Sequence, residues 1–215
     1  MSDVVMTARR RATRERLLEA ATEVFAEDGL LGASVEAICA RAGFTRGAFY
    51  SNFETKEQLF LALLEREFDR RARHLEETAA QLGPVLREAA GQLDPERAAE
   101  YIAEFFAPEG DAASWFALET EFLLLAIRDP AIAPEYQELT DGFIAGITGV
   151  VEGILGAAGR RFVLPAELAV ATLIGEYERA RRAMAIRRNH SAGGFADLAA
   201  RMSELLFVIT SPSSE

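Results

Sequence analysis

Residues 34–59 read SVEAICARAGFTRGAFYSNFETKEQL, and this stretch decides the fold of the N-terminal part of the chain. Ser34 is placed to cap a short helix, because its hydroxyl can accept a hydrogen bond from a free backbone N–H of the first turn. Gly43 predicts the end of that helix, since glycine adopts a positive φ at low cost, and Thr45 predicts the cap of the next one. Thr55 begins Thr-Lys-Glu-Gln, a capping-box pattern that starts a third helix. The order helix, glycine-containing turn, helix is that of the helix-turn-helix motif, whose second helix lies in the DNA major groove.

Several segments of this region resemble the signature of the TetR family of transcriptional regulators. Residues 42–53, AGFTRGAFYSNF, and residues 55–59, TKEQL, are similar to the family's helix-turn-helix. Residues 16–21, RLLEAA, and residues 25–29, FAEDG, are similar to the family's first helix and to the end of that helix. The resemblance covers residues 10–65, about a quarter of the chain. It implies an all-α fold, with a three-helix DNA-binding head followed by a helical domain for ligand binding and dimerisation.

The rest of the chain shows helical hydrophobic spacing, and no segment has the alternation that is typical of a strand. Besides the two helices of the motif, the spacing predicts seven helices, at residues 10–27, 55–82, 95–107, 111–127, 134–158, 166–188 and 194–209. The total of about nine resembles the family's fold. The tail from residue 210 is polar, and we expect it to be frayed. We divide the chain into a DNA-binding domain with a basic arm, residues 1–54, and a ligand-binding and dimerisation domain, residues 55–215.

The composition indicates a globular protein of the cytoplasm. Half of the 215 residues are hydrophobic and 27% are charged, which excludes a disordered chain. The single cysteine, Cys39, excludes an internal disulfide, fits a reducing compartment and is expected to be buried. No run approaches the roughly 18 apolar residues of a membrane span and no signal peptide is visible, so we expect no association with a membrane.

The charge is distributed unevenly along the chain. The net charge is −11, but residues 1–60 hold eight Lys or Arg against nine Asp or Glu. Residues 61–215 hold fifteen against twenty-five, so the acidity belongs to the C-terminal part. Five arginines crowd the N-terminal end, at positions 9, 10, 11, 14 and 16. A basic arm beside a helix-turn-helix is the expected electrostatic footprint of a DNA-binding protein.

The second helix of the motif carries the residues expected to meet DNA. Arg46 stands at its start, where a planar guanidinium can donate to guanine O6 and N7. Gly47 and Ala48 keep the helix thin, and Ala48 could touch a thymine methyl group. The family resemblance implies phosphate or sugar contacts for Tyr50, Ser51 and Asn52, and a phosphate contact for Lys56. The full predicted set is Ser34, Thr45, Arg46, Gly47, Ala48, Tyr50, Ser51, Asn52 and Lys56. Three aromatic residues of the region are read as core, namely Phe44, Phe49 and Phe53.

The resemblance also implies a small-molecule pocket and a dimer interface in the C-terminal domain. Seven aromatic residues could line the pocket of a hydrophobic effector, although each could equally be plain core: Phe105, Phe106, Trp115, Phe116, Phe122, Phe143 and Tyr177. The family's interface is a four-helix bundle made by the last two helices of each subunit. Here those helices carry the apolar residues Leu168, Val170, Leu173, Ile174, Leu198, Met202, Leu205, Leu206 and Ile209.

Five glycines form a stripe along one predicted helix. Gly142, Gly146, Gly149, Gly153 and Gly156 recur at spacings of four and three residues, which places them on one helical face. Each costs about 1 kcal/mol relative to alanine in a helix interior. Three explanations remain open: close approach of a neighbouring helix, room for a ligand, or a helix that kinks or ends early.

The sequence therefore predicts a ligand-responsive homodimeric repressor of TetR type that binds a palindromic DNA operator and is released by a small-molecule effector. No catalytic constellation, metal-ligand spacing or cofactor-binding loop is present in the sequence, so we expect no enzyme activity, no metal and no cofactor. One alternative is a TetR-like activator or architectural DNA binder without an effector. The other is a helical enzyme or interaction protein whose head does not bind DNA.

Overall fold

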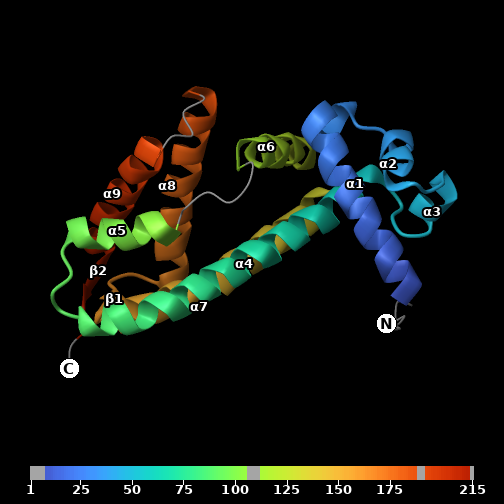
Figure 1. Cartoon of the computed structure of the whole chain (residues 1–215). Helices are drawn as coiled ribbons and strands as arrows, with labels where there is room; N and C mark the ends of the chain where they lie inside the picture. The colour runs from blue at the N-terminus through green and yellow to red at the C-terminus, as the bar shows by residue number, and fades with distance from the viewer. Residues whose placement is uncertain (1–7, 106–111, 188–191, 214–215) are drawn as a thin grey trace. The chain divides into compact units, whose positions relative to one another are not determined.

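The computed structural model describes residues 8–105, 112–187 and 192–213, with the backbone alone at residues 104–105, 112–114, 187 and 192–195. Within this part the chain forms nine helices and two short strands, which confirms the predicted all-α class (Figure 1). The helices are α1 (Ala8–Gly32), α2 (Val35–Ala42), α3 (Arg46–Tyr50), α4 (Lys56–Glu88), α5 (Pro95–Phe105), α6 (Ala112–Arg128), α7 (Ala133–Ala157), α8 (Ala166–Arg187) and α9 (Ala192–Ile209). The strands are β1 (Arg160–Phe162) and β2 (Thr210–Pro212).

The chain divides into two compact units that do not follow one sequence boundary. The first unit comprises residues 1–67 and 117–138, and the second comprises residues 68–116 and 139–215. Helices α4, α6 and α7 therefore each contribute residues to both units. The first unit holds all the predicted DNA-contacting residues together with parts of three later helices.

The core of the first unit is built from apolar residues of α1, the helix-turn-helix, the start of α4 and the end of α6. Five apolar residues of α1 lie at helical spacing and are buried: Leu17, Leu18, Ala21, Val24 and Phe25. The Phe60 ring of α4 meets the Phe25 ring edge-on at 5.7 Å and stacks on the Phe122 ring of α6 at 4.5 Å. Aromatic packing of this kind stabilises a core beyond the area it buries.

Helix α1 ends in a kink that a residue of α6 stabilises. Gly29 has φ 72° and ψ 172°, a conformation that only glycine adopts readily. The turn frees the backbone N–H of Leu30, which donates to Oε2 of Glu121 at 2.7 Å. Lys56 completes the arrangement, since its Nζ donates to the carbonyls of Leu30 at 2.9 Å and Ala33 at 3.1 Å.

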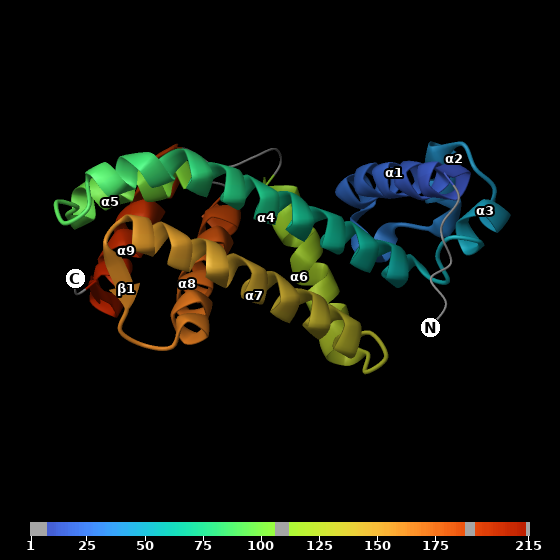
Figure 2. The same cartoon turned by 90° about the horizontal axis from the view of Figure 1, so that it is seen from below.

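In the second unit, α9 packs against α5 and α8 (Figures 1 and 2). Many of the apolar residues expected at a dimer interface belong to this internal core instead. Five of them are buried within the chain: Val170, Leu173, Leu198, Met202 and Ile209. Leu168 is 57% exposed, and the remaining three are partly buried. The assignment of the whole set to an interface is therefore wrong for these five residues, because contacts within the chain, such as those of α5 and α8 with α9, bury them and the pattern of a single helix cannot show this.

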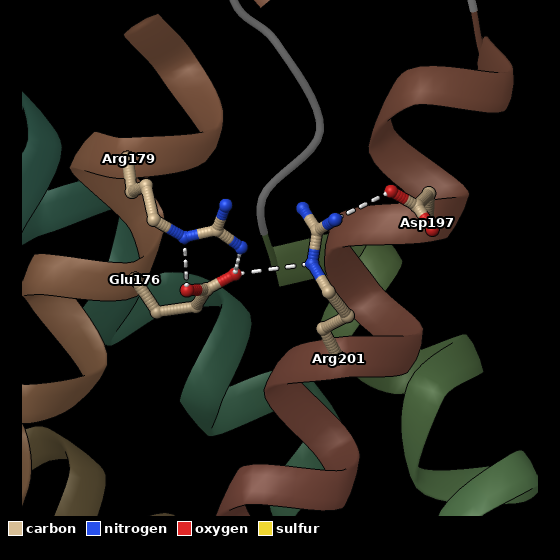
Figure 3. Close-up of polar contacts among 4 residues, drawn as sticks. All are labelled: Glu176, Arg179, Asp197 and Arg201. Atoms are coloured by element: carbon tan, nitrogen blue, oxygen red, sulfur yellow. Dashed lines mark hydrogen bonds and ion pairs between the residues drawn. The ribbon is translucent and has the colours of Figure 1, made fainter. Parts of the chain in front are cut away.

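An ion-pair network links α8 to α9 on this unit (Figure 3). Arg179 donates two hydrogen bonds to the Glu176 carboxylate, at 2.8 and 2.7 Å. Arg201 donates to the same carboxylate at 3.0 Å and to Asp197 at 2.7 Å. These hydrogen bonds, Arg179's foremost, hold the pKa of Glu176 below its usual range, so the network stays ionised at neutral pH.

Helix α4 continues past the point where the sequence predicted its end. Gly83 and Pro84 lie inside the helix, which runs on to Glu88. A proline in a helix interior removes a backbone hydrogen bond and usually costs about 3 kcal/mol. Leu82 and Leu86, on either side of the proline, are buried against Ala158 and the neighbouring residues of α7. The burial of these two leucines offsets the cost of the proline, and it comes from tertiary packing that the sequence of the helix does not show.

The polar tail forms a strand, in contrast to the frayed end expected from its sequence. β2 pairs antiparallel with β1, with Phe162 opposite Thr210. Arg160 stabilises the pair, since Nε donates to Thr210 Oγ1 at 2.8 Å and the guanidinium lies 4.0 Å from the centre of the Phe207 ring. A three-residue pairing is too short to leave an alternation in the sequence.

Helix α7 is unusually apolar for its exposure. By length and composition it could cross a membrane, with a mean hydropathy of 1.3 over an 18-residue window that is only 17% buried. Such a helix is weak support for a membrane span, and four carboxylates lie along it, at Glu135, Glu138, Asp141 and Glu152. The expectation of no membrane association remains a prediction.

The glycine stripe of α7 faces open space in this chain. A Cβ added at any of its five glycines would meet nothing within 4 Å among the residues that the structure describes. The explanation by a close helix crossing within the chain is therefore wrong, and so is the early end, because α7 continues to Ala157. Room for a ligand and a crossing with a second copy of the chain remain, and the first has one supporting observation, described below.

Because these glycines are open, alanine substitution is expected to stabilise the protein. Gly146→Ala and Gly149→Ala should each raise the free energy of unfolding by about 1 kcal/mol, the helix-propensity difference between the two residues. Denaturant melts of the single variants measure this. A loss of stability at Gly146 would mean that a second copy covers the stripe in solution.

Candidate DNA-binding surface

The helix-turn-helix forms through the local hydrogen bonds that its sequence predicts. The Ser34 hydroxyl accepts from the N–H of Ala37 at 3.1 Å, and the Thr45 hydroxyl accepts from Ala48 at 3.3 Å. Between the two helices, Gly43 adopts φ 71° and ψ 32°. The Thr55 hydroxyl accepts from the N–H of Gln58 at 3.1 Å at the start of α4. These caps fix where each helix begins and therefore which residues α3 presents.

Buried aromatic residues attach α3 to the head. Phe49 and Phe53 are 0% and 1% exposed, which confirms that both belong to the core. Phe44 is partly buried, and Arg16 lies over its ring at 4.9 Å. Cys39 is also buried, as expected, and burial raises the pKa of its thiol above the usual value. A protonated, buried thiol is a packing residue.

The opposite face of α3 is open to solvent and carries most of the predicted DNA contacts. Thr45, Arg46, Gly47, Tyr50 and Ser51 are exposed. Ala48 and Asn52 are partly buried beside them, and Ser34 is exposed at the start of α2. The structure thus brings eight of the nine predicted residues to the caps and the outer side of one motif.

Arg46 is held by two neighbours at the front of α3. One terminal nitrogen forms an ion pair with the Glu36 carboxylate of α2, and the other donates to the Tyr50 hydroxyl at 3.3 Å. The guanidinium also lies 5.7 Å from the centre of the Tyr50 ring. The hydrogen bond to Tyr50 and the charge of Glu36 raise the pKa of Arg46, so this residue is charged at every physiological pH. Glu36 lies in the first turn of α2, where a carboxylate is favourable beside the free N–H groups of the helix start.

Ser51 and Asn52 are turned toward the backbone of their own helix. The Ser51 hydroxyl donates to the carbonyl of Ala48 at 2.9 Å, and Nδ2 of Asn52 donates to the same carbonyl at 2.8 Å. Oδ1 of Asn52 is buried and accepts no hydrogen bond from the described residues. The phosphate contacts expected of these two residues remain predictions.

Lys56 lies at the start of α4 but is tied to the end of α1. Its ammonium group is partly buried and donates to the carbonyls of Leu30, in the last turn of α1, and of Ala33, just after it. A cation at a helix C-terminus is favourable, because the free carbonyls there carry partial negative charge. Lys56 is therefore part of the head's internal structure, and its predicted phosphate contact remains a prediction.

Three arginines of the predicted basic arm have a comparable internal role. Arg10 donates to the carbonyl of Ser51 at 3.0 Å, and Arg14 to that of Asn52 at 3.5 Å. Arg16 donates to the carbonyl of Ala42 at 2.9 Å. Each guanidinium thus caps the C-terminal end of α2 or α3. Sequence reasoning missed this role, because the acceptors are backbone atoms 26 to 41 residues away.

Arg14 and its neighbours on α1 divide the arm into two kinds of residue. The Arg14 guanidinium lies 4.3 Å from the centre of the Phe53 ring, and burial lowers its pKa. Arg9 and Arg11 are exposed on the same helix. Arg10 and Arg16 are exposed as well, and each donates to one of the backbone carbonyls described above.

The aromatic residues proposed for a ligand pocket do not form one cluster. Phe105 has no described side chain and Phe106 lies outside the described residues, so neither can be placed. Phe122 lies in the core of the first unit and is 0% exposed. The other four lie in the second unit, in ring contacts with α4 or α8 residues: Trp115 with Arg71, Phe116 and Tyr177 with Arg181, and Phe143 with Phe68.

The second unit contains an open pocket of about 320 Å³ between α4 and α7. Its lining residues are small, apolar or charged: Glu76, Ala79, Ala80, Gly83, Arg87, Gly149, Val150, Gly153, Ile154 and Ala157. None of the five predicted aromatic residues whose side chains the structure describes is among them. Gly149 and Gly153 of the α7 stripe do line it, so the absence of their side chains contributes to this space.

Comparison with known proteins matches the head to one family. Residues 17–63 match the family profile described as "Bacterial regulatory proteins, tetR family". The HTH-type transcriptional repressor AcnR of Corynebacterium efficiens is 41% identical over 86 residues, which are 40% of this chain and 43% of AcnR. The match therefore spans less than half the length of this curated relative.

Solved structures of similar fold cover nearly the whole chain. A TetR transcription regulator from Haloarcula marismortui has a TM-score of 0.68 at 13% identity, covering 94% of this chain and 100% of that one. FadR of Bacillus subtilis, solved in complex with stearoyl-CoA, has a TM-score of 0.57 at 20% identity, covering 89% and 96%. At these identities the likeness concerns the fold.

Proposed function

We propose that this chain, whose head matches the TetR family, belongs to that family and is a transcriptional repressor that binds a palindromic DNA operator as a homodimer. A two-fold symmetric dimer presents its recognition helices to successive major grooves, about 34–36 Å apart. A role in regulation, rather than catalysis, agrees with the relatives to which the chain is similar.

One observation carries this proposal. Helix α3 is capped at Thr45, anchored from behind by Phe49 and Phe53, and exposes Arg46 and Tyr50 on its outer face. A major-groove helix contacts base edges with residues near its N-terminus, which is where Arg46 stands. If the head did not bind DNA, the exposure of Arg46 and Tyr50 on a helix held in place by caps and buried aromatic residues would have no explanation.

Selection of duplexes from a random pool by the full-length protein tests the proposal. The wild type should enrich a palindrome, and Arg46→Ala should relax the preference at one base pair per half-site, at a cost of about 1–3 kcal/mol. Arg41→Ala is the control, because Arg41 is an exposed arginine paired with Glu23 and Glu27 on another face of the head. The base preferences of the duplexes that Arg41→Ala selects should match those of the wild type. If the wild type enriches no sequence, the proposed function fails.

We further propose that a hydrophobic small molecule binds the second unit and releases the operator. Binding changes operator affinity only if the effector prefers the state that does not fit DNA. The open pocket between α4 and α7 has the size of a small ligand site, about 300 Å³ or more. A cytoplasmic location is proposed with this role, and the buried Cys39 is compatible with a reducing compartment.

A further inference from the structure

The carboxylate of Glu36 lies on the surface that is proposed to bind DNA. Glu36 lies in the first turn of α2 and pairs with Arg46 of α3, across the turn of the motif. Duplex DNA carries a dense negative charge, so a carboxylate beside the recognition helix opposes binding. The pair also adds little to stability, because the two side chains are 60% and 58% exposed.

The geometry leaves Arg46 free to read a base while it keeps both neighbours. A guanidinium has five N–H donors, of which Glu36 and Tyr50 each accept from one terminal nitrogen. A bidentate contact with guanine needs two more donors. By donor count, recognition of guanine and the bond to Glu36 are therefore compatible.

On DNA without the recognised base, Arg46 can contact only phosphates, and the effect of Glu36 on binding is different. Phosphates lie away from the base edges, so a contact with them needs a different orientation of Arg46, and we infer that this orientation breaks its bond to Glu36. The carboxylate would then remain unpaired beside the phosphate backbone, where repulsion penalises it. Such a repulsive element discriminates against a wrong partner without strengthening the right one.

We propose that Glu36 is a specificity-determining residue, which orients Arg46 toward one base pair and opposes its use on other sequences. The inference rests on the proposed DNA-binding function. It assigns Glu36 two separable effects: its hydrogen bond orients Arg46, and its charge weakens binding to DNA in general.

Two substitutions at this position separate the effects. Glu36→Gln keeps an acceptor for Arg46 and removes the charge, whereas Glu36→Ala removes both. Both variants should bind a random duplex more tightly, on the order of threefold to tenfold. Glu36→Ala should also reduce the preference at the base pair read by Arg46 about fivefold or more, and Glu36→Gln should keep most of that preference.

Two further proteins complete the experiment. Glu27→Gln removes one negative charge from another ion pair of the head, that with Arg41, and should leave the base preference unchanged. In an Arg46→Ala background, Glu36→Ala should cause no further loss of preference. Dissociation constants for the selected operator, for its single-base variants and for a random duplex measure all of this, with thermal melts to check folding.

Two results would overturn the proposed role of Glu36. Equal tightening on every sequence by both Glu36 variants, with the base preference intact, would overturn the inference and leave Glu36 a general charge. A loss of preference that persists in the Arg46→Ala background would overturn it as well. If the wild type binds operator selectively, either result leaves the proposed function standing. If the wild type binds no duplex selectively, both fail together.

Discussion

Replacing Phe122 with alanine is expected to lower the free energy of unfolding by about 3–5 kcal/mol, the usual cost of removing a fully buried aromatic side chain. The ring is 0% exposed and stacks on Phe60 at 4.5 Å. It also meets the ring of Tyr136 at 5.6 Å. The substitution would leave a cavity at the centre of the first unit, because neighbouring rings cannot collapse into it without losing their own contacts. Urea or guanidinium melts measure the change.

Leu124→Ala is the control for this prediction, since Leu124 lies two residues further along α6 and is 49% exposed. It should change stability by no more than about 0.5 kcal/mol. The comparison also tests the ligand contact that the sequence suggested for Phe122. A Phe122→Ala protein that is as stable as the wild type but has lost its effector response would mean that the ring lines a pocket.

Gly29→Ala is the second large effect, an expected loss of about 2–4 kcal/mol. At φ 72° an alanine side chain is strained, and its Cβ would lie 3.1 Å from Oε1 of Glu121. The Glu121 carboxylate would have to move, although it accepts the hydrogen bond of the Leu30 N–H at 2.7 Å. Leu30 is 0% exposed, so water cannot easily replace the lost acceptor.

Gly32→Ala separates this effect from a general response of the helix end. Gly32 belongs to the same helix, and its added Cβ would make an ordinary contact of 3.5 Å with Cβ of Asp28. Alanine there should be neutral or stabilise by up to about 1 kcal/mol. Equal thermal midpoints for Gly29→Ala and the wild type would show that the kink is dispensable.

The two predictions concern features that the sequence revealed to different extents. The burial of Phe122 could not be deduced, because an aromatic residue at helical spacing looks the same in a pocket and in a core. The kink at Gly29 was visible only as the expected end of a helix. Its partner Glu121 is 92 residues further along the chain, and no local pattern connects the two.

The sequence by itself determined the helix-turn-helix, because every interaction that delimits it is local. The Ser34 and Thr45 caps join residues three positions apart, and Gly43 needs only its own φ. Such hydrogen bonds form wherever the residue types and spacing allow them. The same holds for the buried face of the first helix, which follows from its periodicity.

Only the tertiary structure decided what the charged residues of the head do and how the later helices end. Arg16 and Lys56 bind backbone carbonyls 26 residues away, acceptors that every residue offers and no sequence marks. Glu36 meets Arg46 because the turn at Gly43 brings α2 and α3 together. Pro84 stays inside α4 since Leu82 and Leu86 are buried against another helix. These outcomes depend on the sum of contacts between distant segments, which local propensity does not contain.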